Sequence, residues 1–156
     1  MQEKMRHNDL ARNGGKTNLD ILLQTMQPVL TDGVYVFHSS NITLGETAAL
    51  NPILIFREEE GTTLILLKET ADKHGLDYHY PARMITLNVH SSLDAVGFLA
   101  AITHKLAAGG ISVNPVSAHF HDHLFVPEDK AQHAIDILAT FSFPEHESAS
   151  PSPSTT

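Results

Sequence analysis

The sequence of 156 residues predicts an α+β fold, a sandwich of strands and helices. Two observations lead to this prediction. Between Met84 and Leu138, the spacing of apolar residues alternates between strand and helix periods, in the order of a βαββα unit that one further strand would close. The N-terminal half holds a second mixed set of strands and helices. A chain of this length folds as one compact unit or as two small packed ones.

The C-terminal unit begins with a strand and continues with a helix. Apolar residues alternate between Ile85 and Val89, which is typical of a strand buried on one face. Ser91 or Ser92 can accept hydrogen bonds from free backbone N–H groups, so we expect the helix to begin near Leu93. The helical spacing predicts a buried stripe made of Val96, Leu99, Ala100, Thr103, Leu106 and Ala107.

A hairpin and a second helix complete this unit. The pair Gly109-Gly110 ends the first helix, because glycine takes the left-handed cap conformation without steric cost. A strand pattern then leads to Val116, and a return strand over 124–126 ends at Pro127. Residues 128–141 are again helical. The apolar face of this helix consists of Ala131, Ala134, Ile135, Leu138 and Ala139.

The N-terminal half alternates in the same way. We predict a helix over 19–26, strands over 34–37, 52–56 and 63–67, and a helix over 68–74. Gly61 fits the turn that joins the second and third of these strands. The identity between the two halves is too low to identify a repeat from the sequence. Residues 1–17 are polar and residues 145–156 are a Ser/Pro run, and both compositions predict disorder.

Composition excludes several classes of protein. With 10 Lys and Arg against 18 Asp and Glu, the formal net charge of -8 repels phosphate backbones, so we expect no nucleic-acid partner. The absence of cysteine excludes disulfides and thiolate zinc sites and agrees with a cytoplasmic location. No apolar run approaches the roughly 20 residues of a membrane span, and no signal-peptide pattern opens the chain. We therefore expect no membrane partner.

The run from His119 to His123 is the strongest candidate for metal chemistry. Neutral imidazoles and a carboxylate can ligate zinc. The run is one residue short of the H-x-H-x-D-H pattern of metallo-β-lactamase-type hydrolases. A metal-binding protein or small metal-dependent enzyme that uses His119, His121 and His123 is therefore the alternative function. No phosphate loop, nucleophile elbow or H-E-x-x-H helix is present, so we predict no enzyme activity and no cofactor.

Four blocks of the C-terminal half carry a family resemblance: ITL at 85–87, SSLDAVGF at 91–98, GISVNP at 110–115 and HDHLFVP at 121–127. In this order and spacing they resemble ACT domains, ferredoxin-like βαββαβ units that bind amino acids and regulate metabolic enzymes. The branch they resemble most includes the aspartokinase-type and arginine-sensor-like tandem proteins. The resemblance implies a degenerate ACT-like unit over 18–80 and a regular ACT domain over 81–144.

The resemblance also implies a ligand site. Its residues are Ser91, Ser92, Leu93, Asp94, Ala95, Val96, Gly97, Phe98, Asn114, Pro115 and Asp122. In the ACT-like sensors, the aspartate at the position of Asp122 helps to hold the ligand's ammonium group. The free N–H groups at the start of the helix favour the ligand's carboxylate. Asn114-Pro115 belongs to the strand that runs beside the ligand. Two plainer interpretations stay open, since Asp122 at a turn can bond its own backbone and the serines can be ordinary helix caps.

Together these points predict a non-enzymatic regulatory protein that binds a free amino acid or a similar small zwitterion. Regulation of this kind requires a ligand that binds two states unequally. The chain would act on a partner enzyme or signalling protein in trans, or through its own assembly. Side-by-side pairing of ACT domains implies a homodimer. A scaffold that kept the fold and lost the ligand is a third interpretation.

Overall fold

The computed structural model describes residues 18–89 and 96–142. The helices of this part are α1 (Asn18–Thr25), α2 (Leu44–Ala48), α3 (Lys68–Lys73), α4 (Phe98–Ala108) and α5 (Ala131–Ala139), with the 3-10 turn η2 (Glu128–Lys130) before α5. The strands are β1 (Gln27–Leu30), β2 (Tyr35–Ser40), β3 (Leu54–Arg57), β4 (Thr62–Leu67), β5 (His79–Asn88), β6 (Asn114–Ser117) and β7 (Asp122–Pro127). None of the helices described is long and apolar enough to cross a membrane.

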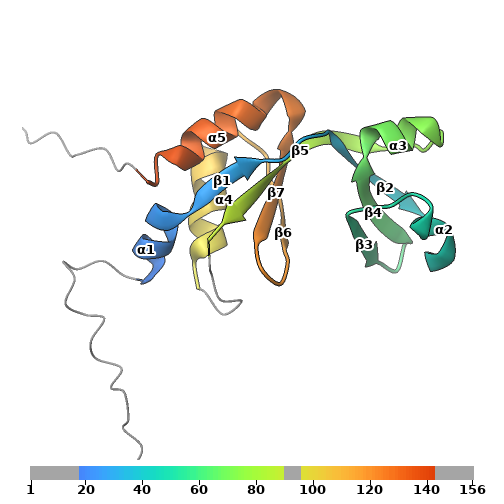
Figure 1. Cartoon of the computed structure of the whole chain (residues 1–156), viewed down its shortest axis with the longest axis horizontal. Coiled ribbons are helices and arrows are strands. Elements are labelled where there is room, and N and C mark those ends of the chain that lie inside the picture. The colour runs from blue at the N-terminus through green and yellow to red at the C-terminus, as the bar shows by residue number, and fades with distance from the viewer. Residues whose placement is uncertain (1–17, 90–95, 143–156) are drawn as a thin grey trace, which may run out of the picture.

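One antiparallel sheet joins the two halves, in the order β3-β4-β2-β5-β7-β6. The long strand β5 belongs to both halves, because its start pairs with β2 and its remainder lies between β1 and β7. Figure 1 shows the result: α1, α4 and α5 gather around the half formed by β1, β5, β7 and β6, and α2 and α3 lie at the other end of the molecule with β2, β3 and β4.

Each half has βαββαβ topology, which confirms the predicted pair of ferredoxin-like units. The N-terminal unit uses β2, α2, β3, β4, α3 and the start of β5, and the C-terminal unit uses β5, α4, β6, β7, α5 and β1. The closing strand of the C-terminal unit therefore comes from the beginning of the chain. Residues 27–30 lie inside the range 18–80 predicted for the N-terminal unit, yet they pair with residues 85–88.

Three groups of buried side chains stabilise this arrangement. The largest lies between the C-terminal half of the sheet and its helices: Met26, Ile85, Leu87, Phe98, Ile102, Leu106, Ile111, Leu124, Val126, Ala131, Ala134 and Leu138. The second lies between β2, β4 and α3: Val36, Leu50, Leu64, Leu66 and Ala71. The third, here called the junction core, packs the helix-free faces of the two half-sheets together: Tyr35, Ile65, Ala82, Met84 and Phe125.

The hairpins of the two units are built alike. Leu54 of β3 pairs with Ile65 of β4 in the way that Asn114 of β6 pairs with Phe125 of β7, a constant shift of 60 positions (54 to 114, 65 to 125). The turns match as well, since each is closed by a backbone hydrogen bond between equivalent residues, of 2.8 Å in the first hairpin and 3.0 Å in the second. The structure thus reveals a repeat that the sequence identity is too low to show.

The start of α4 differs from the prediction. The helix begins at Phe98 instead of near Leu93, and Gly97 before it has a φ of 89°, in the left-handed region that favours glycine. The later start also changes the buried face: Phe98 and Ile102 are buried, whereas Val96, predicted to lie in the buried stripe, is 90% exposed. The left-handed residue interrupts the helical pattern that the spacing of apolar residues suggested.

Candidate functional site

Asp122, the predicted partner of an ammonium group, is the first residue of β7. It lies opposite Ser117 of β6 and Leu87 of β5. Ser117 Oγ donates a hydrogen bond of 2.6 Å to Asp122 Oδ1. The aspartate therefore bonds a side chain across the hairpin, in contrast to the interpretation of a turn aspartate that bonds its own backbone. Within the described residues Oδ2 has no hydrogen-bond partner, so it can accept from a ligand.

The hairpin register explains which residue accompanies Asp122. The turn lies at His119-Phe120, so Asp122 lies beyond it and is not the turn residue of the plainer interpretation. The N–H of Ala118 donates a hydrogen bond of 3.0 Å to the carbonyl of His121. This register brings Ser117 to Asp122, although the sequence did not single out that serine. The only sequence signal for Ser117 was a hydroxyl near the end of the strand before the turn. Its pairing with Asp122 can be predicted only when the position of the turn is known.

Asn114 and Pro115 do not lie beside Asp122. They pair with Phe125 and Leu124, at the opposite end of the short strand β6. Asn114 also shares a sheet face with Phe125, whereas Asp122 lies on the other face, because successive strand residues alternate. The structure therefore separates the predicted strand contact from the predicted ammonium contact.

The predicted loop before α4 is described only in part. Ser91, Ser92, Leu93, Asp94 and Ala95 lie outside the described residues. Val96 is exposed, and Gly97 is the N-cap of α4 without a side-chain cap hydrogen bond. Phe98 is 2% exposed and packs in the C-terminal core, so its side chain supports α4 and is not available to a ligand.

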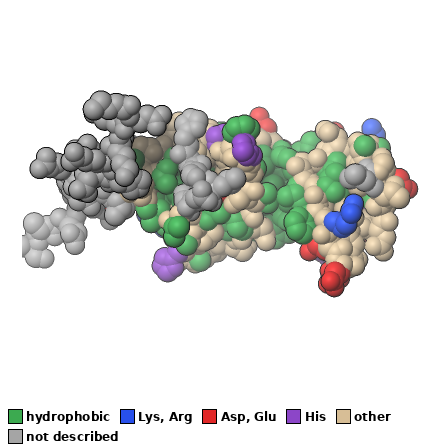
Figure 2. Space-filling view, turned by 90° about the horizontal axis from the view of Figure 1, so that it is seen from below, with side chains coloured by type: hydrophobic (Ala, Val, Ile, Leu, Met, Phe, Trp, Pro, Cys, Tyr) green, Lys and Arg blue, Asp and Glu red, His purple; other side chains and the backbone are tan. Residues whose placement is uncertain are grey.

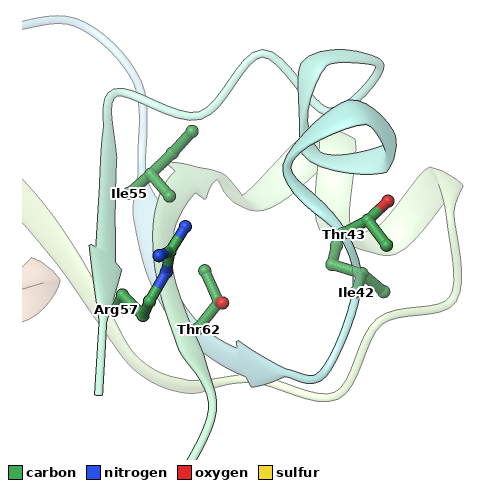
Figure 3. A pocket seen from close by; sticks show the side chains of 5 residues that line it. All are labelled: Ile42, Thr43, Ile55, Arg57 and Thr62. Carbon is green, nitrogen blue, oxygen red and sulfur yellow. The ribbon is translucent and has the colours of Figure 1, made fainter.

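The repeat points to an equivalent position in the N-terminal unit. There, an open hollow of about 420 Å³ is lined by Ile42, Thr43, Ile55, Arg57 and Thr62. Figure 3 shows the Arg57 side chain extending from β3 into the space between β3 and the segment that carries Ile42 and Thr43. The shift of 60 positions relates Arg57 to Ser117 and Thr62 to Asp122. No local pattern in the sequence indicates this hollow, because it depends on the repeat.

One wall of the hollow is fixed by the start of α2. Glu46 Oε2 accepts hydrogen bonds from the hydroxyl and the backbone N–H of Thr43, at 2.7 and 2.8 Å. Both bonds hold the pKa of Glu46 below its usual value, and the bond from the hydroxyl has the larger effect. The carboxylate therefore stays ionised and keeps both hydrogen bonds. Arg57 and the Thr62 hydroxyl remain as donors toward the hollow. They suit an anionic group such as a carboxylate.

The histidine-rich run divides between different surroundings. His119 packs edge-on against Phe120 at the turn, with ring centroids 4.6 Å apart. His121 Nδ1 is buried without a hydrogen-bond partner among the described residues, and His123 Nδ1 lies 3.0 Å from Thr86 Oγ1. Nowhere in residues 18–89 and 96–142 are three His, Asp or Glu side chains grouped so as to hold one metal ion. The geometry therefore gives no support to the alternative metal site.

His123 makes the stability of the fold depend on pH. Burial lowers the pKa of His123, the nearby His121 lowers it further, and Asp122 raises it in part. The folded state therefore binds a proton less readily than the unfolded state, whose histidine pKa is about 6.5. We expect the free energy of unfolding to be highest above about pH 6.5 and to fall as the pH drops through the pKa of the folded state.

Urea unfolding between neutral and mildly acidic pH measures this dependence. In His123→Phe the decrease on acidification should be smaller than in the wild type. The exposed His133 of α5 provides the control, because His133→Gln should keep the wild-type slope. Equal slopes in His123→Phe and the wild type would contradict the assignment.

Two family models identify the units. Both are described as ACT domain, and they match residues 14–83 and residues 80–140. The chain belongs to the ACT domain family. Its two ACT domains stand in tandem and meet at β5, the strand that the two units share. ACT domains are regulatory units, and this places the protein among those with a regulatory, ligand-binding role.

Solved structures agree with this assignment. The chain is 46% identical to a Vibrio cholerae protein of unknown function, described as a possible transport protein; the match covers 80% of this chain and 95% of that one, with a TM-score of 0.75. Two more distant proteins share the fold. One is a protein from Agrobacterium tumefaciens, with 17% identity and a TM-score of 0.62 over 75% of this chain and 89% of that one. The other is the regulatory subunit of aspartate kinase from Thermus flavus, with 9% identity and a TM-score of 0.55 over 73% of this chain and 95% of that one. A comparison with curated proteins finds no match.

Proposed function

We propose that this tandem ACT protein is non-enzymatic, binds a free amino acid or a similar small zwitterion, and regulates a partner in trans or through its own assembly. The observation that carries the proposal is the position of Asp122. Its carboxylate is held by Ser117 at 2.6 Å, at the end of the sheet where β5 leads toward α4. The serine is an uncharged donor, so the negative charge of Asp122 is left for an ammonium group.

The N-terminal hollow supports the same class of ligand. Arg57 supplies a permanent positive charge, and Thr62 adds a hydroxyl donor to the lining. Arginine binds carboxylates through two parallel hydrogen bonds when the geometry allows. The two units thus offer one charge each, of opposite sign, at positions that the repeat makes equivalent, and an amino acid carries the complementary group for either position.

Thermal unfolding with each of the twenty amino acids at millimolar concentration tests the proposal. A ligand at 100 times its dissociation constant stabilises the folded state by about 2.7 kcal/mol, or a few degrees in a chain of this size. We expect one amino acid, or a few related ones, to raise the midpoint. Asp122→Asn removes the charge but keeps an acceptor for Ser117, so the shift should be lost in this variant.

Matched variants separate the two units. Arg57→Gln shows whether the N-terminal hollow takes part, since it removes the charge and retains a polar side chain. Asp32→Asn, at an exposed position in the segment between β1 and β2, should leave the ligand shift unchanged. The proposed site would be contradicted if no amino acid raised the unfolding midpoint. It would also be contradicted if the rise in midpoint persisted in both Asp122→Asn and Arg57→Gln.

The exposed strand edges support the proposed homodimer. β6 and β3 are the two ends of the strand order. The side chains favour β3, because Ile55 is 42% and Phe56 is 61% exposed there, with Ile53 before them at 50%. An apolar strand with a free edge is a natural surface for pairing with a second strand. We therefore place the dimer contact at β3.

Phe56→Lys is expected to convert the dimer into a monomer, because a lysine on a strand edge opposes pairing. Light scattering coupled to size exclusion gives the mass directly. The control is Phe120→Lys, which introduces the same charge at the hairpin tip, where the phenylalanine is 74% exposed. A wild-type protein that is monomeric at high micromolar concentration, or a Phe56→Lys variant that stays dimeric, would exclude this interface.

A further inference from the structure

A second cavity lies between the two ACT domains, on the helix-free face of the sheet. Its volume is about 100 Å³. It is lined by Ile53, Leu54, Met84, Val116, Ala118, His123 and Phe125. The first two residues come from the N-terminal unit, Ile53 just before β3 and Leu54 at its start, and the others come from β5, β6, the segment after β6, and β7. In Figure 2, hydrophobic side chains gather between the two halves of the molecule.

The chemistry of the lining differs from that of the Asp122 site. Six of the seven lining side chains are apolar, and the exception is His123. Its Nδ1 is already engaged with Thr86 Oγ1 at 3.0 Å, so Nε2 is the ring nitrogen left for a ligand. Burial keeps the pKa of His123 below its usual value, and the ring is therefore neutral at neutral pH. A neutral ring offers either one donor or one acceptor at Nε2.

The size of the cavity sets the size of its occupant. Its volume of about 100 Å³ limits the occupant to a small group. The pocket opens to solvent, since Ile53 is 50% exposed and Ala118 is exposed, and its walls offer a single polar side chain to any water inside it. The walls therefore favour an apolar group with the size of one small ring. A single hydroxyl on that ring can donate to or accept from Nε2, whichever tautomer His123 adopts.

We propose that the cavity is a second ligand site, specific for a small aromatic ring that carries one hydroxyl group. Phenol is the simplest molecule of this class. The ligand would contact Ile53 and Leu54 of one unit and Val116 and Phe125 of the other. It would therefore stabilise the arrangement in which the two units are packed, and act as an effector of a different chemical class from the zwitterion at Asp122.

The geometry of β7 makes the two sites distinct. Successive residues of a strand point to opposite faces, so Asp122 lies on the helix-covered face and His123 lies on the junction face. A zwitterion and a phenol-like ligand would thus approach the same strand from opposite sides. The cavity can be occupied whether or not an amino acid binds, and the two proposals can fail independently.

Nuclear magnetic resonance of the full chain tests the cavity, with phenol and toluene as the probes. These molecules have nearly the same shape and differ in the hydroxyl group. We expect saturable shifts in the methyl signals of Ile53, Leu54 and Val116 with both. Phenol should bind roughly 3- to 10-fold more tightly, which is the contribution of one hydrogen bond. In His123→Phe this preference for phenol should disappear.

A variant that fills the cavity provides the decisive control. Val116→Phe places a ring where the probe would lie, and it should abolish the shifts caused by both molecules. The dispersion of the spectrum shows whether this variant is folded, and Ala118→Leu, at an exposed position on the rim, replaces it if it is not. Shifts that map elsewhere, equal affinities for phenol and toluene, or full binding in the filled variant would each overturn the proposal.

Discussion

Replacing Phe125 by alanine is expected to lower the free energy of unfolding by about 3 to 5 kcal/mol. Phe125 is 2% exposed and lies at the centre of the junction core. Its ring meets Tyr35 and Phe37 edge-to-face, with centroid distances of 5.8 and 5.7 Å. The substitution removes both aromatic contacts and leaves a cavity between the two ACT domains. A domain is typically stable by only about 5 to 15 kcal/mol, so the loss is a large fraction of the total.

Urea unfolding measures this loss, and the same hairpin supplies a matched control. Phe120→Ala makes the same chemical change at a position that is 74% exposed, where we expect an effect within about 0.5 kcal/mol. If Phe125→Ala destabilises by no more than Phe120→Ala, the junction core does not hold the units together. A biphasic unfolding curve in Phe125→Ala alone would show that the core is what makes the two units unfold as one.

The sequence shows why the central strands were predictable. Leu124, Phe125 and Val126 form a continuous apolar run, because Leu124 and Val126 face the C-terminal helices and Phe125 faces the junction. When consecutive residues of a strand are buried, the sequence shows a run of apolar residues. The strands over 63–67 and 124–126 were predicted from such runs. The same runs are apolar on both faces, which is typical of strands buried on two sides. That feature was the sequence signal for a junction between two half-sheets.

Elements that depend on distant contacts were not predictable in the same way. β1 has only four residues and contains Pro28, and its role as a strand comes from pairing with residues 85–88. Nothing within residues 27–30 specifies that partner. α2 is a five-residue helix without a prediction, although the Thr43 and Glu46 capping box at its start is a local signal in the sequence.

The candidate site follows the same division. Asp122 could be chosen from the sequence, because the resemblance to ACT domains marks its block. The hydrogen bond between Asp122 and Ser117 could not be predicted from the sequence, because it forms only when the turn lies at His119-Phe120. Arg57 belongs to the site only through the structural repeat. Charge and motif therefore indicated which residues could bind a ligand, and the register of two hairpins determined which of them lie together.

Deleting residues 1–31 is expected to unfold the C-terminal unit, although the deleted segment is joined in sequence to the N-terminal one. The deletion removes α1 and β1, and with them Met26, which is 1% exposed in the C-terminal core. Leu19, Leu22, Leu23 and Leu30 pack against the same core. Losing one buried Leu or Met side chain costs about 2 to 5 kcal/mol, so the loss of this segment exceeds the stability of a typical domain.

Complementation distinguishes the missing strand from a general effect of truncation. A synthetic peptide of residues 18–31, added to the truncated chain, should restore the dispersed amide spectrum of residues 79–142, because β1 can pair with β5 without being covalently connected to β2. Deletion of residues 1–17 is the matched control, since it leaves α1 and β1 in place. If the chain without residues 1–31 still unfolds cooperatively and binds the peptide no better than a scrambled one, then β1 does not close the C-terminal ACT domain. Restoration by the peptide would show that this domain is discontinuous in sequence, with the N-terminal domain inserted between its last strand and its first.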